Sequence, residues 1–498
     1  MALLPKKTLL DKLLWSWKPE SDREAGHAIV SNFLLHWFPN RVLLKSIAYN
    51  YSFYLGTICF TLFMILSVTG AILMFFYTPS VERAYWSIKD IDFVVSFGWF
   101  LRRSHRVSAH LMVIAVFLHM FRVFLTGAYK RGTSAGSSRE FNWILGVVLF
   151  VLTLMLSFTG YLLPWDQLAY WAITVGTNIA ASVPLIGNQI RYLMVGGNEI
   201  GQNTLIRFYV LHIVVLPAML LAVSIWHMWR IRKDGGLAIS EQERARVKEM
   251  KPSQPTKTKT YSLMGVSSGT TVQVFDPTTV NEEKSVPSSP NLVIRILLIV
   301  LATCAVTAIL SAIFQAPLEE AANPRVTPNP AKAPWYFLGL QELVGYSALI
   351  GGVILPGVVV TWLGLIPFID REKKDIGVWF FRTPELKWAI FGGLYGLIAT
   401  VAALLLGVLA PMRSLFPTIE SQIFFDLVNP ATLLFVLVVA LYFIVWKLSS
   451  SSRYATSATF CAFIICFILL TYTGMALRGP NWDFFWPWQA WPQHPIPF

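Results

Sequence analysis

Nine apolar runs constrain the fold of this chain more than any other feature, because each is long enough to cross a lipid bilayer. A hydrocarbon core of about 30 Å requires about 20 apolar residues in a helix. Within lipid, a helix satisfies all its backbone hydrogen bonds internally. The sequence therefore predicts an all-α, polytopic membrane protein. The expected spans lie near 51–77, 106–127, 143–163, 206–229, 292–315, 346–368, 388–410, 427–447 and 457–477.

The composition agrees with this class and excludes others. Of the 498 residues, 55% are hydrophobic and only 13% are charged, which is too apolar for a soluble domain of this size. The net charge of +13 does not indicate nucleic-acid binding, because Lys and Arg beside membrane spans act as topological anchors. The cysteines lie in apolar segments without a CxxC or CxxCH pattern, so we expect packed thiols rather than disulfides, zinc ligands or a c-type haem attachment. They are Cys59, Cys304, Cys461 and Cys466.

The distribution of basic residues predicts the orientation of the chain. The basic connections follow the second, fourth, sixth and eighth spans, and residues 230–290 alone carry ten Lys or Arg. The positive-inside rule places the N-terminus in the cytoplasm and the C-terminus outside, in a bacterial cytoplasmic membrane. The first residues, MALLPKKTLLDKLLWSWKPE, favour an interfacial amphipathic helix over a signal peptide.

Four histidines in two of these spans form a regular pattern. His105 and His119 are 14 residues apart, and His212 and His227 are 15 apart, so each helix presents two imidazoles on one broad face, about 21–22 Å apart along its axis. The two spans run in the same direction, so we pair His105 with His212 near the outer side and His119 with His227 near the inner side. Two imidazoles at one depth suit the axial positions of a haem iron. His110 lies roughly 140° around the helix from His105 and is interpreted as a packed or hydrogen-bonded residue.

Glycines in the adjacent spans repeat the same interval. Gly56 and Gly70 are 14 residues apart, as are Gly146 and Gly160, which gives each histidine level two positions where a porphyrin edge could approach a backbone. Glycine is also common in membrane helices for packing alone. Zinc is a weaker alternative to haem, because levels so far apart cannot share one metal and each would lack two ligands.

Arginines flank both histidine levels and are candidates to pair with haem propionates. Arg102 and Arg106 flank the outer level, and Arg122 and Arg230 lie three residues beyond the inner histidines. Each of them alone is equally well explained as a residue that snorkels to the membrane interface.

Several stretches resemble cytochrome b of the quinol–cytochrome c or plastocyanin oxidoreductases. They are RRSHRVSAHLMV, LHMFRVFLTGAYK, TGYLLPWDQLAYWA and TLIRFYVLHIVVLP. The 15-residue interval resembles the chloroplast type, and APWYFLGLQE in the second half resembles the quinol-site loop of a subunit-IV-like protein, usually Pro-Glu-Trp-Tyr. The resemblance is strong over about 45–232 and moderate over 290–410.

The resemblance implies quinol oxidation at an outer site, with one electron leaving through a Rieske iron–sulfur protein to a c-type cytochrome. The other crosses the membrane through two haem b groups to an inner quinone site, with proton translocation. It also implies a homodimer of complexes. The outer site would involve Trp165, Asp166, Pro334, Trp335 and Tyr336.

The inner quinone site would lie near His227 and Arg232. Quinone reduction needs a proton donor and a positive charge, which suits Arg232, although this residue is equally plausible as a topology anchor. In the chloroplast type a cysteine of the first span attaches an extra haem. Tyr54 occupies that position here and Cys59 lies on another face, so we expect no covalent haem.

The quinol loop lacks its usual glutamate, because Pro334 stands in that place. On a helix running from 334 onward, Glu342 is the only carboxylate, and a charge beside an apolar span is costly without a function. We therefore expect Glu342 to accept the quinol proton. In the competing interpretation Asp166 or a water accepts it, and Glu342 pairs with Arg325 or Arg413.

The predicted function is a di-haem cytochrome b subunit of a respiratory quinol:cytochrome c oxidoreductase. The alternatives are the cytochrome b anchor of a dehydrogenase or hydrogenase, and a transporter or scaffold with a histidine proton path. The Trp- and Pro-rich tail 478–498 is either a docking surface for an external partner or an aromatic belt. The expected parts are an N-terminal segment 1–48, a di-haem domain 49–232, a linker 233–290, a subunit-IV-like domain 291–411 and two extra spans with the tail, 412–498.

Overall fold

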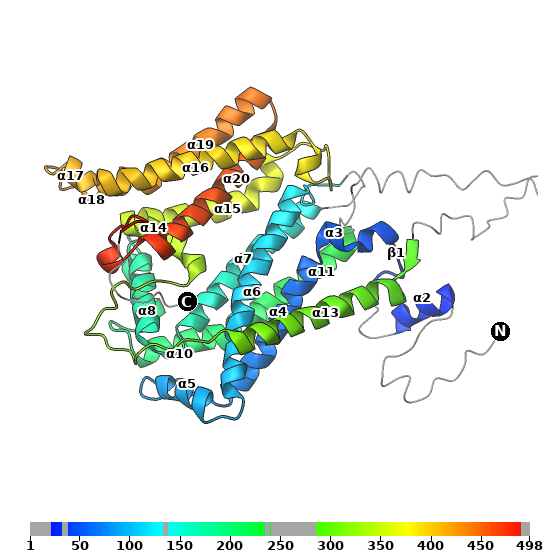
Figure 1. The fold of residues 1–498 in the computed structure, drawn as a ribbon, viewed down its shortest axis with the longest axis horizontal. Coiled ribbons are helices and arrows are strands. Elements are labelled where there is room, and N and C mark those ends of the chain that lie inside the picture. Colours follow the sequence, from blue (N-terminus) through cyan, green and yellow to red (C-terminus); the bar gives the residue numbers. More distant parts are fainter. Residues whose placement is uncertain (1–20, 32–37, 133–137, 235–239, 241–284, 490–498) are drawn as a thin grey trace, which may run out of the picture.

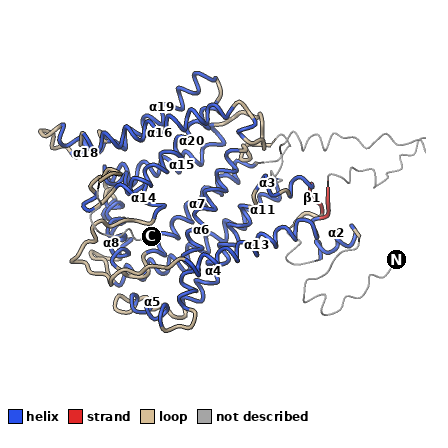
Figure 2. Tube along the Cα trace, viewed as in Figure 1, coloured by secondary structure: helices blue, strands red, loops and turns tan. Residues whose placement is uncertain are grey.

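The computed structural model describes residues 21–31, 38–132, 138–234, 240 and 285–489. Within these residues nine helices are long and apolar enough to cross a membrane, which confirms the predicted number of spans and the all-α class. Helices dominate the trace, as Figure 2 shows. The spans are α4 (Leu55–Met74), α6 (Gly98–Leu125), α7 (Arg139–Tyr161), α10–η3–α11 (Gln202–Val210, Leu211–Val215, Leu216–Asp234), α13 (Ser288–Ile313), η5–α15 (Ile350–Ile354, Leu355–Ile369), α16 (Glu385–Leu409), α19 (Pro430–Ser449) and α20–η7 (Ser452–Tyr472, Thr473–Leu477).

The first four spans form one bundle in the middle of the molecule (Figure 1). Helix α4 packs on α6, α6 on α7, and α7 on α11. Apolar side chains of all four helices meet between the two histidine levels and separate them. The buried members of this core are Leu62, Phe63, Met112, Ala115, Leu152, Leu216 and Leu220.

The second half packs against this bundle and holds the two extra spans. Helix α13 lies on α4 and α6, whereas α16, α19 and α20 pack on one another (Figure 1). A Cβ atom at Gly392 or Gly396 of α16 would lie 2.1 Å or 2.7 Å from the backbone of Ala458 or Ala462 of α20. Small residues four apart on both helices thus allow the backbones to approach closely, as is common in membrane interfaces.

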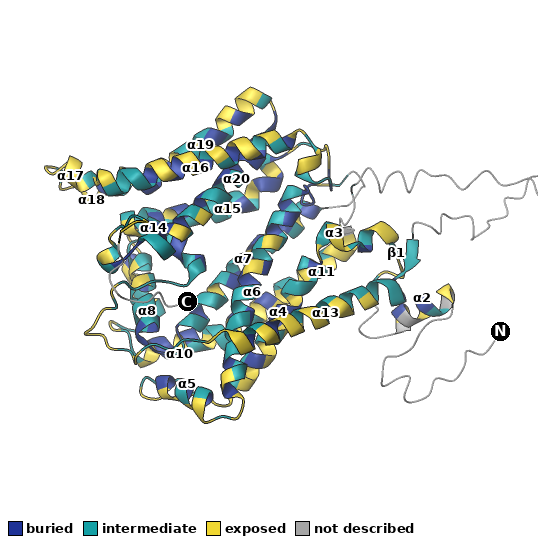
Figure 3. Ribbon diagram, viewed as in Figure 1, coloured by how far each residue is buried: buried dark blue, intermediate teal, exposed yellow. Residues whose placement is uncertain are grey.

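Buried charged groups join the two halves at one end of the bundle. Arg453 of α20 donates from Nε to Glu385 at 2.9 Å and from Nη1 to the hydroxyl of Tyr129, which follows α6, at 2.7 Å. Lys130 and Asp370 form a further ion pair of 3.0 Å. All of these groups are buried. Figure 3 shows how buried and exposed residues are distributed over the helices. Because each charge in this cluster has a partner, the cluster can hold the last span against the four-helix bundle.

Shorter elements cover the ends of the spans. Strands β1 (Arg41–Leu43) and β2 (Ser285–Pro287) pair antiparallel, with Val42 opposite Val286, and connect the segments that precede the two halves. Residues 1–20, where we expect an amphipathic helix, and most of the linker 233–290 lie outside the described residues. The remaining elements are α2 (Asp22–Ser31), η2 (Leu44–Ile47), α3 (Tyr49–Ser52), α5 (Ala84–Phe93), α8 (Gln167–Ala181), α9 (Gly187–Val195), α14 (Trp335–Tyr346), η6 (Phe380–Arg382), α17 (Met412–Leu415), α18 (Gln422–Leu427) and η8 (Pro480–Trp482).

Candidate functional site

Two pairs of histidines face each other inside the four-helix bundle. In the first histidine level, His105 and His212, the ring centroids lie 6.3 Å apart with the planes at 77°. In the second histidine level, His119 and His227, the values are 6.5 Å and 82°. Two metal–nitrogen bonds of about 2.0 Å, plus roughly 1.1 Å from each nitrogen to its ring centre, would give about 6.2 Å. Both gaps therefore fit an iron with two axial imidazoles, and the pairs are those expected from the spacing.

A π-helical turn accounts for the 15-residue interval between His212 and His227. The segment η3 surrounds His212 and interrupts the α-helical spans before and after it. A π-bulge accommodates one extra residue in a helix, and such bulges are frequent at functional sites. The remaining 14 residues equal the interval between His105 and His119, so both pairs meet at matching depths.

Threonine hydroxyls set the tautomer of the first histidine level. Thr69 donates its single hydrogen to the carbonyl of Ile65 at 2.7 Å, so it accepts a hydrogen from Nδ1 of His105, 2.9 Å away. Thr159 holds Nδ1 of His212 in the same way, at 3.1 Å. With Nδ1 protonated, Nε2 keeps its lone pair, which is the form in which a neutral histidine binds iron.

Each of the four histidines faces a glycine of a neighbouring helix. A Cβ atom at Gly160 would lie 2.5 Å from Cε1 of the facing imidazole, whereas at Gly146 the same distance would be 3.7 Å. The four predicted glycines thus lie beside the rings, two at each level. The facing pairs are Gly70 with His105, Gly160 with His212, Gly56 with His119 and Gly146 with His227.

Polar and basic groups also surround the second histidine level. Nδ1 of His227 donates to the carbonyl of Asn142 at 3.2 Å, which again leaves Nε2 with its lone pair. The guanidinium of Arg122 lies 4.7 Å from the centre of the Tyr51 ring. Arg230 donates to the backbone carbonyl of Ser138, which precedes α7, at 2.9 Å. Arg232 lies in the last turn of α11 and is exposed.

Tyr54, where the chloroplast type carries a cysteine, is the residue that precedes α4. Its side chain is buried, and its hydroxyl donates to the carbonyl of Ile47 at 2.9 Å. Cys59 packs against the apolar core of the bundle. Neither side chain faces a histidine in the contacts that the structure describes.

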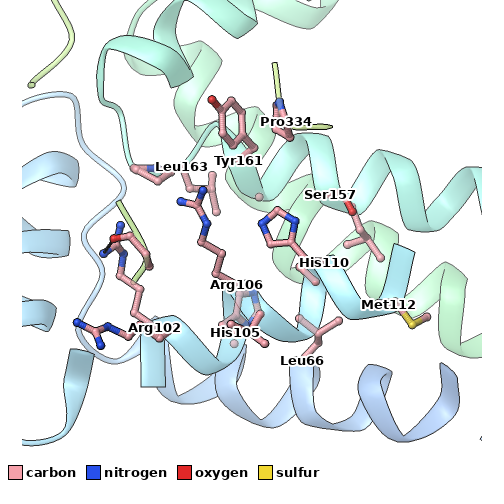
Figure 4. Close-up of a pocket in the computed structure, with 18 of the residues that line it drawn as sticks. Leu66, Arg102, His105, Arg106, His110, Met112, Ser157, Tyr161, Leu163 and Pro334 are labelled. Carbon is pink, nitrogen blue, oxygen red and sulfur yellow. Dashed lines mark hydrogen bonds between the residues drawn. The ribbon is translucent and has the colours of Figure 1, made fainter. Parts of the chain in front are cut away.

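A cavity of about 1120 Å³ adjoins the first histidine level, and Figure 4 shows part of its lining. The cavity contains residues predicted to face haem together with residues predicted to face quinol. Its volume is slightly above the range of about 300–1,000 Å³ for small-molecule sites, which suits more than one occupant. The relevant lining residues are Gly70, Arg102, His105, Arg106, His110, Gly160, Tyr161, Asp166, His212, Glu319, Lys332, Pro334, Trp335 and Tyr336.

The two arginines of this cavity are tied to the segment that follows α13. Arg102 forms a buried ion pair with Asp92 and donates to the carbonyls of Ala316 and Pro317 at 2.8 Å and 3.0 Å. Arg106 donates to the carbonyl of Pro317 at 3.3 Å and extends into the cavity in Figure 4. Because Arg102 already has a carboxylate partner, Arg106 is the better placed of the two to bind another anion.

Asp166 lies in the cavity wall with both carboxylate oxygens engaged. Oδ1 accepts from the backbone N–H of Ala169 at 2.9 Å and so caps α8, and Oδ2 accepts from that of Glu319 at 3.2 Å. Asp166 also forms a backbone bridge with Ala321. Burial raises the pKa of the Asp166 carboxyl. The preceding Trp165, only 4% exposed, packs in an apolar cluster and does not line the cavity.

The Pro334–Trp335–Tyr336 segment lines the cavity beside His110. The indole of Trp335 donates to Nδ1 of His110 at 3.1 Å, and the ring of Tyr336 lies edge-on to the same imidazole. Burial raises the pKa of the Tyr336 hydroxyl to about 12, so this group stays protonated at neutral pH. His110 is hydrogen-bonded, as expected. Its side chain lines this cavity and is not enclosed among apolar side chains alone (Figure 4).

Glu342 does not lie where we expected it. Its carboxylate is 1% exposed and accepts from Nε and Nη2 of Arg478 at 2.9 Å and 2.5 Å, and from the indole of Trp482 at 3.1 Å. It is absent from the cavity lining, so it is not placed to accept a quinol proton. The charge is satisfied by an ion pair, as in the competing interpretation, but the partner is Arg478 rather than Arg325 or Arg413. Arg478 and Trp482 thus hold the start of the tail on α14, and residues 490–498 lie outside the described residues.

Sequence reasoning missed other polar residues of the cavity. Glu319 and Lys332 lie in the irregular segment between α13 and α14, and Tyr161 ends α7. Lys332 donates to the carbonyl of Met475 at 2.9 Å, and burial lowers the pKa of its ammonium group. A loop has no periodicity from which the direction of its side chains can be predicted, so the tertiary contacts decide it.

Comparison with known proteins gives the family. The chain matches the model of the family Cytochrome b/b6/petB over residues 41–235. It is 40% identical over 215 residues to cytochrome b6 of Synechococcus elongatus, covering 41% of this chain and 97% of that protein. It is 42% identical over 210 residues to cytochrome b6 of Euglena gracilis, covering 40% of this chain and 95% of the relative.

The fold extends the likeness beyond the first half. A solved structure described as a hyperthermophilic respiratory complex III superposes with a TM-score of 0.55 at 22% identity, covering 84% of this chain and 92% of that one. This likeness shows a shared fold across both halves, with the b6-like part continued by a second helical part in one chain. The protein therefore belongs to the cytochrome b/b6 family, the integral membrane cytochrome b of bc- and bf-type quinol oxidoreductases.

Proposed function

We propose that this chain is the di-haem cytochrome b subunit of a respiratory quinol:cytochrome c oxidoreductase. The observation that supports this function most is that the first histidine level and the Pro334–Trp335–Tyr336 segment line the same cavity. The second half of the chain thus brings a substrate-sized space to the haem-type bundle. A membrane anchor of a dehydrogenase or hydrogenase would need the bundle alone.

In this proposal two haem b groups would bind non-covalently, one held by His105 and His212 and the other by His119 and His227. Bound haem would supply one-electron transfer, and two groups at different depths would offer electrons a route across the membrane. The chain's own part is to hold His105, His212 and His227 in one tautomer through Nδ1 and to leave clearance at the glycines.

Residues of the chain would bind quinol at the outer end and quinone at the inner end. At the outer end, the protonated Tyr336 hydroxyl and the Arg106 guanidinium are donors for quinol oxygens within a mostly apolar wall. At the inner end, Arg232 would supply positive charge near His227 as quinone is reduced. Oxidation outside and reduction inside would release protons on one side and consume them on the other, which is proton translocation.

The proposed partners are a Rieske iron–sulfur protein and a c-type cytochrome, in a homodimer of complexes. The proposed location is a bacterial cytoplasmic membrane, with the N-terminus in the cytoplasm and the C-terminus outside. Residues 478–489 are the described part of the proposed docking tail, and in them the exposed Trp488 stacks on Trp486 with ring centroids 5.2 Å apart.

The test begins with the purified complex. We expect a dithionite-reduced b-type spectrum with two haems for each chain, an iron–sulfur protein in constant ratio, and quinol-dependent reduction of cytochrome c. The variant His119→Leu should lose one haem and keep the other. His110→Gln is its matched control on the same helix and should keep both haems.

A complex that contains the haems but no iron–sulfur protein and does not reduce cytochrome c would favour the membrane-anchor function. The lack of any reduced b band in the spectrum would favour a transporter or scaffold function. Retention of both haems in His119→Leu would refute the pairing.

A further inference from the structure

Oxidation of a quinol to a quinone releases two protons, and the chain must offer an acceptor at the place where quinol binds. The segment at the cavity begins with Pro334, whose side chain cannot accept a proton. Glu342 is buried and paired with Arg478. Among the described residues, the cavity is lined by two carboxylates, Asp166 and Glu319. The proton acceptor is therefore one of these two carboxylates.

Asp166 is poorly suited to take up a proton, because its oxygens already hold the backbone. One caps α8 through Ala169, and the other accepts the N–H of Glu319. Protonation would remove the negative charge that favours both contacts, one of which caps a helix. Asp166 thus acts as a positioning residue for the segment opposite it.

Glu319 combines a fixed backbone with an available carboxylate. The backbone is held by the bond to Asp166, by Gln167 N–H donating to the carbonyl of Glu320 at 2.9 Å, and by Ala322 N–H donating to the carbonyl of Trp165 at 3.2 Å. Within the described part of the chain, no group donates a hydrogen bond to the Glu319 carboxylate. Its side chain is half-buried, whereas the next residue, Glu320, is exposed. Glu319 therefore lies where the cavity meets the surface.

The groups around Glu319 belong to three parts of the molecule and carry both signs. Arginines and histidine come from α6, a tyrosine and an aspartate from the end of α7 and the segment after it, and a lysine from its own loop. Glu319 acts electrostatically on the Tyr161 hydroxyl together with Asp166 and Arg106. Among the charged and titratable groups that line the same cavity are Arg102, Arg106, His110, Tyr161, Asp166 and Lys332.

We propose that Glu319 accepts a phenolic proton of the quinol and passes it to the outer aqueous phase, an inference that rests on the proposed function. The quinol O–H bond breaks and a carboxylic O–H bond forms. The second phenolic proton leaves to the outer aqueous phase. The two electrons leave to one-electron acceptors of the iron–sulfur and cytochrome classes. The protonated Glu319 side chain then releases its proton at the cavity mouth, which restores the carboxylate for the next quinol.

The experiment compares Glu319→Gln with Glu320→Gln in the complete complex. Glutamine keeps the shape but lacks the base, and the neighbouring Glu320 is a matched control because its exposed side chain does not line the cavity. We expect Glu319→Gln to lower kcat for quinol oxidation by about 100-fold, the usual scale for a general base, with KM within about twofold. The low-pH limb of the rate profile should disappear, while Glu320→Gln keeps both the rate and the profile.

The variants Glu319→Asp and Asp166→Asn distinguish loss of the proton acceptor from a structural effect. Glu319→Asp should restore part of the rate and the low-pH limb, and the haem content and reduced spectrum should be unchanged in all variants. Unchanged rate and pH profile in Glu319→Gln would overturn the proposal, as would loss of the limb in Asp166→Asn but not in Glu319→Gln. If the unmodified complex oxidises no quinol, the proposed function itself fails, which is a distinct result.

Discussion

Replacing Gly160 by alanine should disturb the first histidine level selectively. The added methyl group would lie 2.5 Å from Cε1 of His212 and 3.0 Å from its Nε2. Carbon atoms in contact prefer separations of about 3.5–4.0 Å, so the imidazole must move by about 1 Å. Metal–ligand bonds tolerate about 0.2 Å, so His212 cannot keep both its distance from the methyl group and its bond to iron. Overpacking of this kind costs about 1–3 kcal/mol, which corresponds to roughly 5- to 150-fold weaker haem binding at this level.

Gly146→Ala is the matched control, because its methyl group would lie at an ordinary contact distance of 3.7 Å from Cε1 of His227. Haem content for each chain and the reduction potentials of the two b haems would be measured by redox titration of both variants. We expect Gly160→Ala to lose or shift one haem and Gly146→Ala to keep two normal ones. If the two variants behave alike, or if Gly160→Ala changes the second level instead, the assignment of glycines to levels is wrong.

Three further predictions concern other parts of the chain. Glu342→Gln should lower the unfolding free energy by about 3–5 kcal/mol, because it leaves the buried charge of Arg478 without its carboxylate. Thermal unfolding of the purified complex measures this, and adding Arg478→Met should recover part of the loss. Tyr336→Phe should leave the pH dependence of quinol oxidation unchanged between about pH 6 and pH 9, because burial holds the pKa of this hydroxyl at about 12 and it does not titrate there. Haem staining after denaturing electrophoresis should show no covalent haem on this chain, because Tyr54 offers no thiol, and a stained band would contradict this.

Local periodicity was sufficient to predict the spans and the residues that face one another across the bundle. Apolar runs of about 20 residues leave the backbone little choice but to form helices in lipid. The 14-residue interval places His105 and His119 on one face of their helix. The same interval places the glycines of the first and third spans at the same two depths. These features depend on helix geometry alone, so the sequence contains them in full.

Only the tertiary structure decided the details that depend on loops and on contacts between distant residues. The π-helical turn at His212 brings a 15-residue interval into line with one of 14, which an ideal helix does not predict. Glu342 lies on a predictable helix, but its partner Arg478 follows 136 residues later, beyond four further spans. Glu319 reaches the cavity because its loop is bonded to Asp166, 153 residues earlier. Such contacts arise from the packing of whole helices, and no local pattern of residues determines them.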